Sequence, residues 1–563
     1  MKKIYAKSLF IVCLFIGLTG CSTGLDLSPQ DSISDASFWK SSDDYKKAAN
    51  ALYSALPGYS FFDLEADVAF QNPNSISNST ATTPDTDGNW NGAYSQIRNC
   101  NNLIAKASES SIAADLKTYV AEAKFFRAFN YWQLYRLFGG VPIVTKVLDI
   151  NSNELFSSRS SAKETVDFIL NDLKEAVSDL PEESQVASTE RGHITKGAAN
   201  GLRARVALFE GTWRRFRNDG EANTYLDIAV EASSAVMNSR QYALFTAYGK
   251  DSYQKLFDQE GDNNAECVLD RKYEKQVNVE NFAVSIQEQG YLPTKKLADM
   301  YLCSDGLPVD KSPLFQGYEK FTSEFNNRDP RMRQTIMLPG TICYAIYFND
   351  EKVAHWPFYP DRVYTTGYII NKYVTQVPEY NGIYSYSQGI DRHLIRYAEV
   401  LLIYAEAMYE KNGNISDDDL NKTINIIRQR AGLETPLTNA FVTQNRLNMR
   451  EEIRRERTIE LALEGFRWDD VRRWKTAETE LKQAIRGIKI KGTEWGTLPI
   501  LVGGDDRNPY PKQEWQDRTD ADGFIISEPA SARSGFDPNK HYLRPLPAKE
   551  LQLNPALTQN PGW

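Results

Sequence analysis

The chain has 563 residues, of which 41% are hydrophobic and 25% charged, the balance of a globular protein with one large domain or a few smaller ones. Its formal net charge of −9 argues against sequence-independent binding to nucleic acid, because such binding depends on a surplus of lysine and arginine. We therefore expect no nucleic-acid partner.

The first 21 residues have the pattern of a secretory leader that ends at a lipidated cysteine. Three lysines precede an apolar run from Ser8 to Leu18, which is too short to span a bilayer. Leu18-Thr19-Gly20-Cys21 follows the pattern of a bacterial lipobox. We therefore predict that residues 1–20 are a signal peptide and that acyl chains anchor Cys21 to a membrane. The alternative is an ordinary signal peptide followed by a chance cysteine.

After a polar tether over residues 21–42, periodicity predicts a mostly α-helical protein, with residues 43–563 as a single domain. We expect a helical scaffold over about 43–240 and 393–486, an irregular lobe of loops and short strands over about 241–392, and a loop-rich segment over 487–563. The predicted helices cover residues 45–56, 90–107, 113–138, 162–180, 195–210, 221–238, 393–411, 417–431, 445–463 and 465–486.

Charged residues on apolar helix faces are predicted to be structural. Arg127 lies on such a face, and so do Glu399 and Glu406, which need buried partners. A column of acids at i+4 spacing requires facing cations, and the acids and the available cations are Glu452, Glu456, Glu460, Glu464, Arg428, Arg430, Arg454, Arg457 and Arg467. A metal or acid/base site is the alternative, but a di-iron bundle needs Glu-x-x-His and no histidine lies here.

Cysteine spacing and acidic turns leave two questions open. Cys100, Cys267, Cys303 and Cys343 have no zinc-type spacing, and the sequence does not decide between disulfides and free thiols. Asp520-Ala521-Asp522-Gly523 faintly resembles a calcium loop but fails the EF-hand pattern. We expect no cofactor, with an irregular structural calcium site as the alternative.

Several motifs, taken in chain order, resemble the SusD/RagB family. They run from the lipobox to the last residue: Arg127-Ala-Phe-Asn-Tyr131, Phe138-Gly-Gly-Val-Pro142, Thr195-Lys-Gly-Ala-Ala199, Ala204-Arg-Val-Ala-Leu208, Arg396–Ala407, Glu456-Arg457, Arg467, Arg473-Trp474, Tyr542–Pro547, Glu550-Leu551, Asn554-Pro555 and Gln559–Trp563. The C-terminal motifs are the most specific of these.

The resemblance implies a non-enzymatic surface lipoprotein of the outer membrane in Gram-negative bacteria. Such proteins bind a glycan and cover a SusC-like TonB-dependent transporter, which would be the partner of this chain. The family fold has tetratricopeptide-like helix pairs that support an irregular ligand-binding lobe. The motifs belong to the scaffold, so the ligand site has to be predicted from other residues.

Stacking rings and polar side chains in the loops are the candidates for glycan binding. The segment 355–362 carries Trp356, Tyr359 and Arg362, and its prolines stiffen it. The long loop 57–89 offers further hydrogen-bonding groups, and the irregular lobe offers others. The remaining candidates are Asp67, Asn72, Trp90, Tyr291 and Cys303. Trp213 follows a predicted helix end and is expected to be structural.

Two other functions remain as alternatives to glycan binding. Some relatives of the family handle peptides, so the aromatic residues could bind a peptide or protein within the same kind of transporter complex. A lipid-anchored glycoside hydrolase would need two carboxylates flanking the sugar, and the sequence does not exclude such a pair among its 74 acids.

Overall fold

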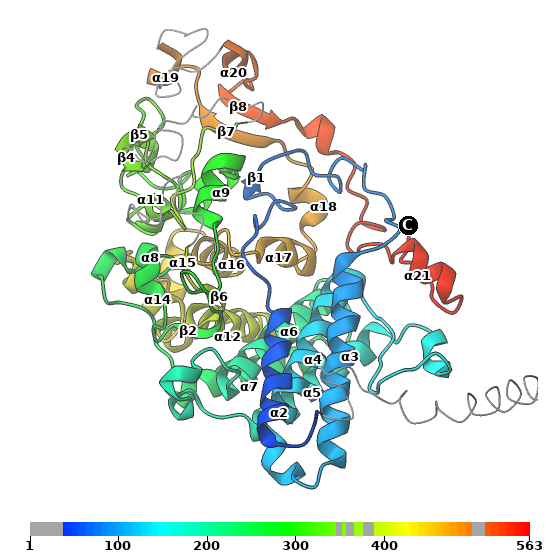
Figure 1. The fold of residues 1–563 in the computed structure, drawn as a ribbon. Coiled ribbons are helices and arrows are strands. Elements are labelled where there is room, and N and C mark those ends of the chain that lie inside the picture. The colour runs from blue at the N-terminus through cyan, green and yellow to red at the C-terminus, as the bar shows by residue number, and fades with distance from the viewer. Residues whose placement is uncertain (1–37, 345–351, 356–364, 375–387, 498–512) are drawn as a thin grey trace, which may run out of the picture.

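The computed structural model describes residues 38–344, 352–355, 365–374, 388–497 and 513–563 (Figure 1). These residues are rich in helices and their sheets are small and two-stranded, which confirms the mostly helical prediction. None of the helices described is both long enough and apolar enough to cross a membrane.

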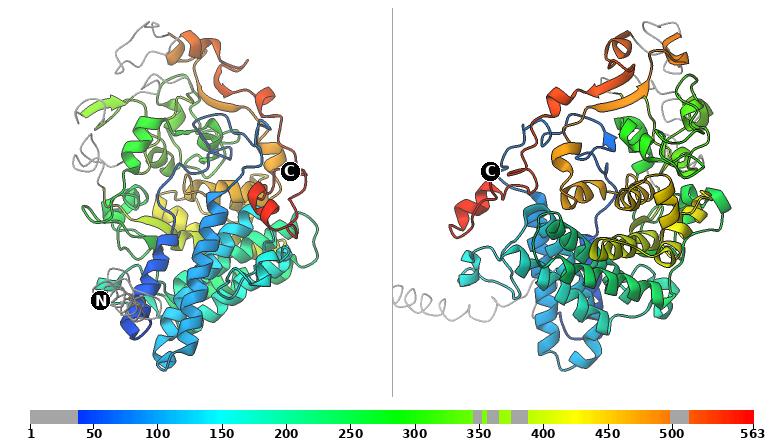
Figure 2. Two further views of the ribbon diagram at one scale, coloured as in Figure 1. Left: turned by 45° about the vertical axis from the view of Figure 1, so that its right-hand side comes forward. Right: turned by 180° about the vertical axis from the view of Figure 1, so that it is seen from behind.

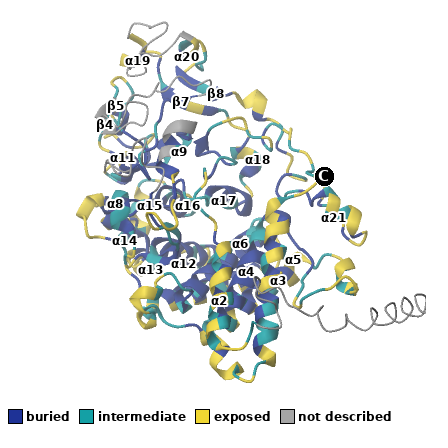
Figure 3. Ribbon diagram, viewed as in Figure 1, coloured by how far each residue is buried: buried dark blue, intermediate teal, exposed yellow. Residues whose placement is uncertain are grey.

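The N-terminal part is a block of helices in which each helix contacts the next along the chain (Figures 1 and 2). Its helices are α2 (Ser42–Leu52), α3 (Gly88–Glu109), α4 (Lys117–Phe138), α5 (Ala162–Asp179), α6 (Lys196–Arg215) and α7 (Ala222–Ser239). α4 and α6 are buried along most of their length, whereas α2 and α3 expose one side (Figure 3). Arg127 on α4 donates two hydrogen bonds to Asp172 on α5, at 2.7 and 2.8 Å, so its predicted structural role is confirmed.

The middle of the chain, together with β1 from the loop between α2 and α3, folds into short elements that form a lobe beside the helical block (Figure 1). These elements are β1 (Ala69–Phe70), α8 (Ser252–Lys255), β2 (Cys267–Arg271), α9 (Phe282–Gln289), β3 (Leu292–Pro293), α10 (Lys295–Met300), α11 (Arg331–Thr335), β4 (Thr341–Tyr344), β5 (Lys352–His355) and β6 (Arg392–Arg396). The strands pair antiparallel as β1–β3, β2–β6 and β4–β5. Buried tyrosines such as Tyr253, Tyr291 and Tyr301 fill the core of the lobe.

The C-terminal part returns to the helical block and then crosses the lobe. Its elements are α12 (Tyr397–Asn412), α13 (Asp417–Asn421), α14 (Ile424–Ala431), α15 (Asn439–Gln444), α16 (Met449–Glu460), α17 (Arg467–Arg473), α18 (Ala477–Glu480), β7 (Ile485–Lys489), α19 (Glu494–Thr497), α20 (Gln513–Asp517), β8 (Phe524–Glu528) and α21 (Ala548–Leu553). β7 and β8 pair antiparallel.

The helix predicted over 417–431 is divided into α13 and α14, and two other predicted helices include residues that form strands. Residues 392–396 form strand β6, which pairs with β2, and α12 begins only after it. The predicted helix 465–486 is two short helices followed by β7, because the backbone of Lys475 adopts φ +60° directly after α17 and ends it. In the first segment, pairing with a strand that is distant in the sequence decides the structure. In the second segment, a turn that the helical periodicity does not reveal decides it.

The C-terminal motif and the Phe138-Gly139-Gly140 motif meet in space. Asn560 Nδ2 donates to the carbonyl of Phe138 at 3.0 Å, and the amide of Arg544 donates to the carbonyl of Leu137 at 2.8 Å. A Cβ at Gly140 would lie 2.2 Å from the carbonyl oxygen of Ser160, so only glycine fits there. These contacts satisfy carbonyls at the end of α4 and attach the chain terminus to the scaffold.

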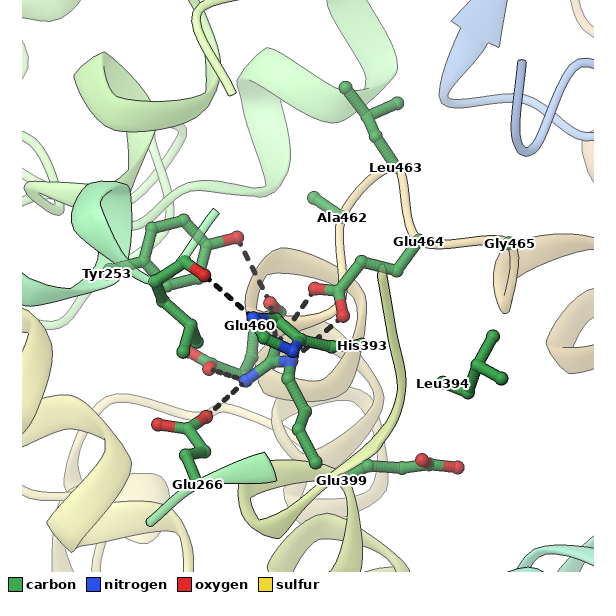
Figure 4. A network of polar contacts seen from close by, with 12 residues as sticks. Tyr253, Glu266, His393, Leu394, Glu399, Glu460, Ala462, Leu463, Glu464 and Gly465 are labelled. Atoms are coloured by element: carbon green, nitrogen blue, oxygen red, sulfur yellow. Dashed lines mark hydrogen bonds and ion pairs between the residues drawn. The ribbon is translucent and has the colours of Figure 1, made fainter. Parts of the chain in front are cut away.

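A cluster of buried charges joins the lobe to the C-terminal helices. The carboxylates of Glu266, Glu460 and Glu464, which are labelled in Figure 4, all accept hydrogen bonds from the guanidinium of Arg396, with N–O distances of 2.6–2.9 Å. We call the whole set the ionic cluster; its five cations and five acids are Arg331, Lys372, Arg396, Arg428, Arg430, Glu266, Asp329, Glu456, Glu460 and Glu464.

The ionic cluster explains how the predicted acid column is stabilised. Burial by itself raises the pKa of Glu460, but Arg430, Arg396 and Arg331 outweigh burial and hold that pKa below its usual value. Arg428 and Arg430 face the column as predicted. The prediction is wrong for Arg454, Arg457 and Arg467, which pair with Glu451, Asp470 and Asp67 instead. Arg331, Arg396 and Lys372 come from the lobe and β6 and were not predicted. Because every acid of the column within this cluster has a cation, the structural interpretation of the column is favoured over a catalytic one.

Replacing Glu460 with Gln should destabilise the fold strongly. Three guanidiniums would lose a buried carboxylate, and breaking a buried ion pair costs about 3–5 kcal/mol. Urea unfolding followed by circular dichroism measures this loss of free energy of unfolding. Asp43→Asn is the matched control, because Asp43 pairs with Lys47 at the surface, where a pair contributes at most about 1 kcal/mol. Equal effects of the two substitutions would contradict a stabilising role for the ionic cluster.

The same pair of proteins should show a defined dependence on pH. The pKa of Glu460 is lower in the folded state than in the unfolded state, so its carboxylate stabilises the fold above the ordinary pKa of about 4.5, and this stabilisation is lost as the pH falls below that value. The difference in free energy of unfolding between the natural protein and Glu460→Gln should therefore shrink below about pH 4.5. A difference that stays constant from pH 6 to pH 3 would contradict this assignment.

Candidate functional site

The sequence-predicted ligand residues do not gather at one place in the described structure. Trp356, Tyr359 and Arg362 lie outside the described residues, so their role stays a prediction. Asn72 is exposed on the loop between α2 and α3, where it remains available to a ligand.

Three of the other candidates are packing residues in this structure. Trp90 is only 4% exposed and packs edge-to-face against Phe138, with ring centroids 5.3 Å apart. Tyr291 is buried in the lobe, where its hydroxyl donates to the carbonyl of Phe62 at 2.8 Å. Cys303 is fully buried in a turn. Their placement does not support stacking or hydrogen bonding with a glycan, because each side chain is enclosed by protein.

Asp67 has a structural partner rather than an open carboxylate. Both of its oxygens accept hydrogen bonds from Arg467, at 2.7 and 2.8 Å. Burial favours the neutral carboxyl, but the guanidinium of Arg467 outweighs it and lowers the pKa of Asp67. Asp67 thus positions Arg467, and Arg467 itself lines a cavity.

This cavity, which we call the polar cavity, has a volume of about 390 Å³ and lies between α10, α16 and the segment from α17 to Gln483. Its volume falls within the range of about 300–1,000 Å³ that small-molecule sites have. The residues that line it are Lys296, Asp299, Met300, Glu451, Arg454, Arg455, Thr458, Arg467, Trp474, Thr476, Glu480 and Gln483.

The lining of the polar cavity contains many hydrogen-bonding groups, some with positive and some with negative charge. Lys296 Nζ lies 2.8 Å from a carboxylate oxygen of Glu480, and Arg454 Nη1 lies 3.5 Å from Glu451. The guanidinium of Arg454 also lies 4.7 Å from the ring centre of Trp474, which holds the long side chain against the cavity wall. Hydroxyl groups can donate to these carboxylates and accept from the ammonium and guanidinium groups. The cavity therefore suits a ligand rich in hydroxyls.

Sequence reasoning missed the polar cavity because its walls come from three separate segments. The one available signal is the spacing of Glu451, Arg454, Arg455 and Thr458, which places them on one face of α16. That spacing describes any solvent-exposed helix face, so it does not by itself identify a cavity.

A second cavity, of about 310 Å³, lies between the scaffold and the C-terminal segment and includes Trp213 in its lining. Trp213 stacks on Phe209, with ring centres 5.6 Å apart, and the guanidinium of Arg217 lies 3.6 Å from its ring centre. These contacts occupy the indole, in agreement with its expected structural role, although Trp213 lies within α6 rather than after it.

Comparison with known proteins adds independent information. A model described as "SusD family" matches residues 242–563, and one described as "Starch-binding associating with outer membrane" matches residues 40–208. SusD-like protein P38 of Formosa agariphila is 26% identical over 539 residues, which cover 88% of this chain and 96% of that protein. A SusD-like protein of Bacteroides ovatus is 24% identical over 99% of this chain and 98% of that protein.

Solved structures show the same fold. A SusD-like carbohydrate-binding protein of Bacteroides fragilis superposes with a TM-score of 0.73 at 23% identity, covering 92% of this chain and all of the other. A laminarin-binding SusD-like protein superposes with a TM-score of 0.59 at 20% identity, covering 92% of this chain and 99% of the other. Since the first family model matches more than half of the sequence, the chain belongs to the SusD family.

Proposed function

We propose that the protein binds a glycan at the cell surface and delivers the glycan to a SusC-like TonB-dependent transporter of the outer membrane. Acyl chains on Cys21 would anchor the protein to this membrane, close to the transporter. Family membership supports glycan binding and association with the outer membrane at a general level. Two structural neighbours are described as binding a carbohydrate and laminarin. Transporter partnership and lipid anchoring rest on the family resemblance and on the lipobox pattern.

The polar cavity is the observation that links the proposed glycan binding to particular residues. It has the size of a sugar site, and its walls present ammonium, guanidinium, carboxylate, hydroxyl and amide groups. Its acids Asp299, Glu451 and Glu480 are paired with Lys295, Arg454 and Lys296, respectively. We propose binding without cleavage, because glycoside hydrolysis requires one carboxyl group to be protonated beside a second that attacks or activates water.

Lys296→Gln should weaken glycan binding by at least about tenfold, because it removes a charge-assisted hydrogen bond worth about 1.5–3 kcal/mol. The measurement is affinity electrophoresis of the protein from Ser22 onward against a panel of polysaccharides, followed by calorimetry with the polymer that retards it. Lys163→Gln is the matched control, because Lys163 also pairs with a carboxylate but lies on α5, far from the polar cavity in sequence and structure.

The outcomes of this assay separate the alternatives. Full affinity in Lys296→Gln together with loss of affinity in Trp356→Ala would move the site from the polar cavity to the sequence-predicted aromatic cluster. Failure to bind any polysaccharide would contradict a glycan ligand and favour a peptide. Release of reducing sugar ends would contradict the non-catalytic proposal.

The anchor can be tested separately from the ligand. Cys21→Ser removes the thiol that the acyl chains would modify, so the protein should move from the membrane fraction to the soluble fraction of lysed cells. Fractionation and immunoblotting measure this change, and Cys303→Ser, which leaves the lipobox intact, is the control. If Cys21→Ser remains in the membrane fraction, lipid anchoring at this residue is wrong.

A further inference from the structure

Three potential metal ligands meet where strands β2 and β6 pair, away from the polar cavity. Cys267 and Asp270 lie on β2, and His393 lies on β6 directly opposite Asp270. His393 Nδ1 lies 2.9 Å from an oxygen of Asp270 and 3.4 Å from the sulfur of Cys267. One ligand atom from each residue lies within 4.8 Å of the other two.

The orientation of the imidazole is fixed from its other side. His393 Nε2 donates to the backbone carbonyl of Leu256 at 2.8 Å, which leaves Nδ1 facing the thiol and the carboxylate. A histidine that binds a metal ion through one nitrogen usually donates its other N–H to a carbonyl or carboxylate. His393 is therefore held in the orientation of a metal ligand.

The separations between these atoms are close to those of a tetrahedral zinc site. Zinc bonds of about 2.3 Å to sulfur and about 2.0–2.2 Å to nitrogen and oxygen place the N–S pair about 3.5 Å apart and the N–O pair about 3.4 Å apart. The observed N–S separation is 3.4 Å, and the N–O separation of 2.9 Å needs to open by about half an ångström.

The access of an ion to this site and the number of ligands available there also agree with a zinc site. Cys267 and Asp270 line a cavity of about 230 Å³, which would admit the ion and leave room for a water molecule as fourth ligand. The second oxygen of Asp270 is buried and has no hydrogen bond. Lys272 Nζ lies 3.7 Å from that oxygen but bonds to Asp391 at 2.6 Å, so this oxygen of Asp270 keeps coordinating capacity.

We propose that Cys267, Asp270 and His393 bind one divalent cation of the zinc type. Thiolate, imidazole and carboxylate together favour zinc over calcium or magnesium, which prefer ligand sets made of oxygen alone. Binding releases the protons of the thiol and of Nδ1, since both atoms must be free to coordinate. The ion would cross-link β2 to β6 beside the ionic cluster. Glu266, directly before β2, and Arg396, the last residue of β6, belong to that cluster.

The test uses the protein from Ser22 onward, which retains every described residue, with Co²⁺ and Zn²⁺ as probes. Co²⁺ should bind with a stoichiometry of one and give a thiolate-to-cobalt absorption band in the near ultraviolet, together with the visible bands of tetrahedral cobalt. Zn²⁺ should abolish these bands by displacement, and it should raise the Tm of the protein because it binds the folded state.

Cys267→Ser should lose the thiolate band and bind Zn²⁺ at least about tenfold more weakly, while Cys303→Ser, which removes a different free thiol, should behave as the natural protein. Asp270→Asn should keep the thiolate band but weaken binding. Absence of a thiolate band in the natural protein, or a band that survives in Cys267→Ser, would overturn the proposal. Circular dichroism shows whether each variant is folded, and the assay is independent of glycan binding.

Discussion

The ionic cluster is the interaction on which the rest of the structure depends. Its five cations and five acids come from the lobe, from β6, from the helices α14 and α16 and from the turn that follows α16, and their side chains are almost completely withdrawn from water. A buried charge without a partner is far more costly than a broken surface pair. The segments therefore fit together only in the arrangement that pairs all of these groups, and this requirement places the lobe on the helices.

The same physical principle accounts for the sequence motifs. Arg205 on α6 forms two hydrogen bonds to Glu399 on α12, and Arg473 on α17 forms two to Glu406 on α12. An arginine and a glutamate that are joined by two hydrogen bonds fix the relative orientation of their side chains as well as pairing their charges. The motifs thus define a scaffold.

Helix α16 connects the scaffold to the polar cavity. Glu456 and Glu460 point from one side of α16 into the ionic cluster, whereas Glu451, Arg454, Arg455 and Thr458 line the cavity from another side. A helix whose one face is held by buried ion pairs cannot rotate or slide easily. The cavity groups on its other face are therefore preorganised, which reduces the entropy that a ligand loses on binding.

The sequence alone determined the features that depend on local patterns. Helical periodicity located α3 to α7, and a capping box of Ser161 and Glu164 begins α5. The i+4 acid column correctly indicated that α16 needs facing cations. Helices are predictable in this way because their backbone hydrogen bonds join residues four positions apart.

Tertiary structure alone decided which distant residues meet. Arg331, Lys372 and Arg396 joined the ionic cluster although the sequence gives no sign of their partners, and Trp90 and Tyr291 proved to be packing residues. Cys267 and His393 are 126 positions apart and meet only because β2 pairs with β6. Strand pairing and burial depend on the packing of the whole chain, and no local pattern of residues encodes them.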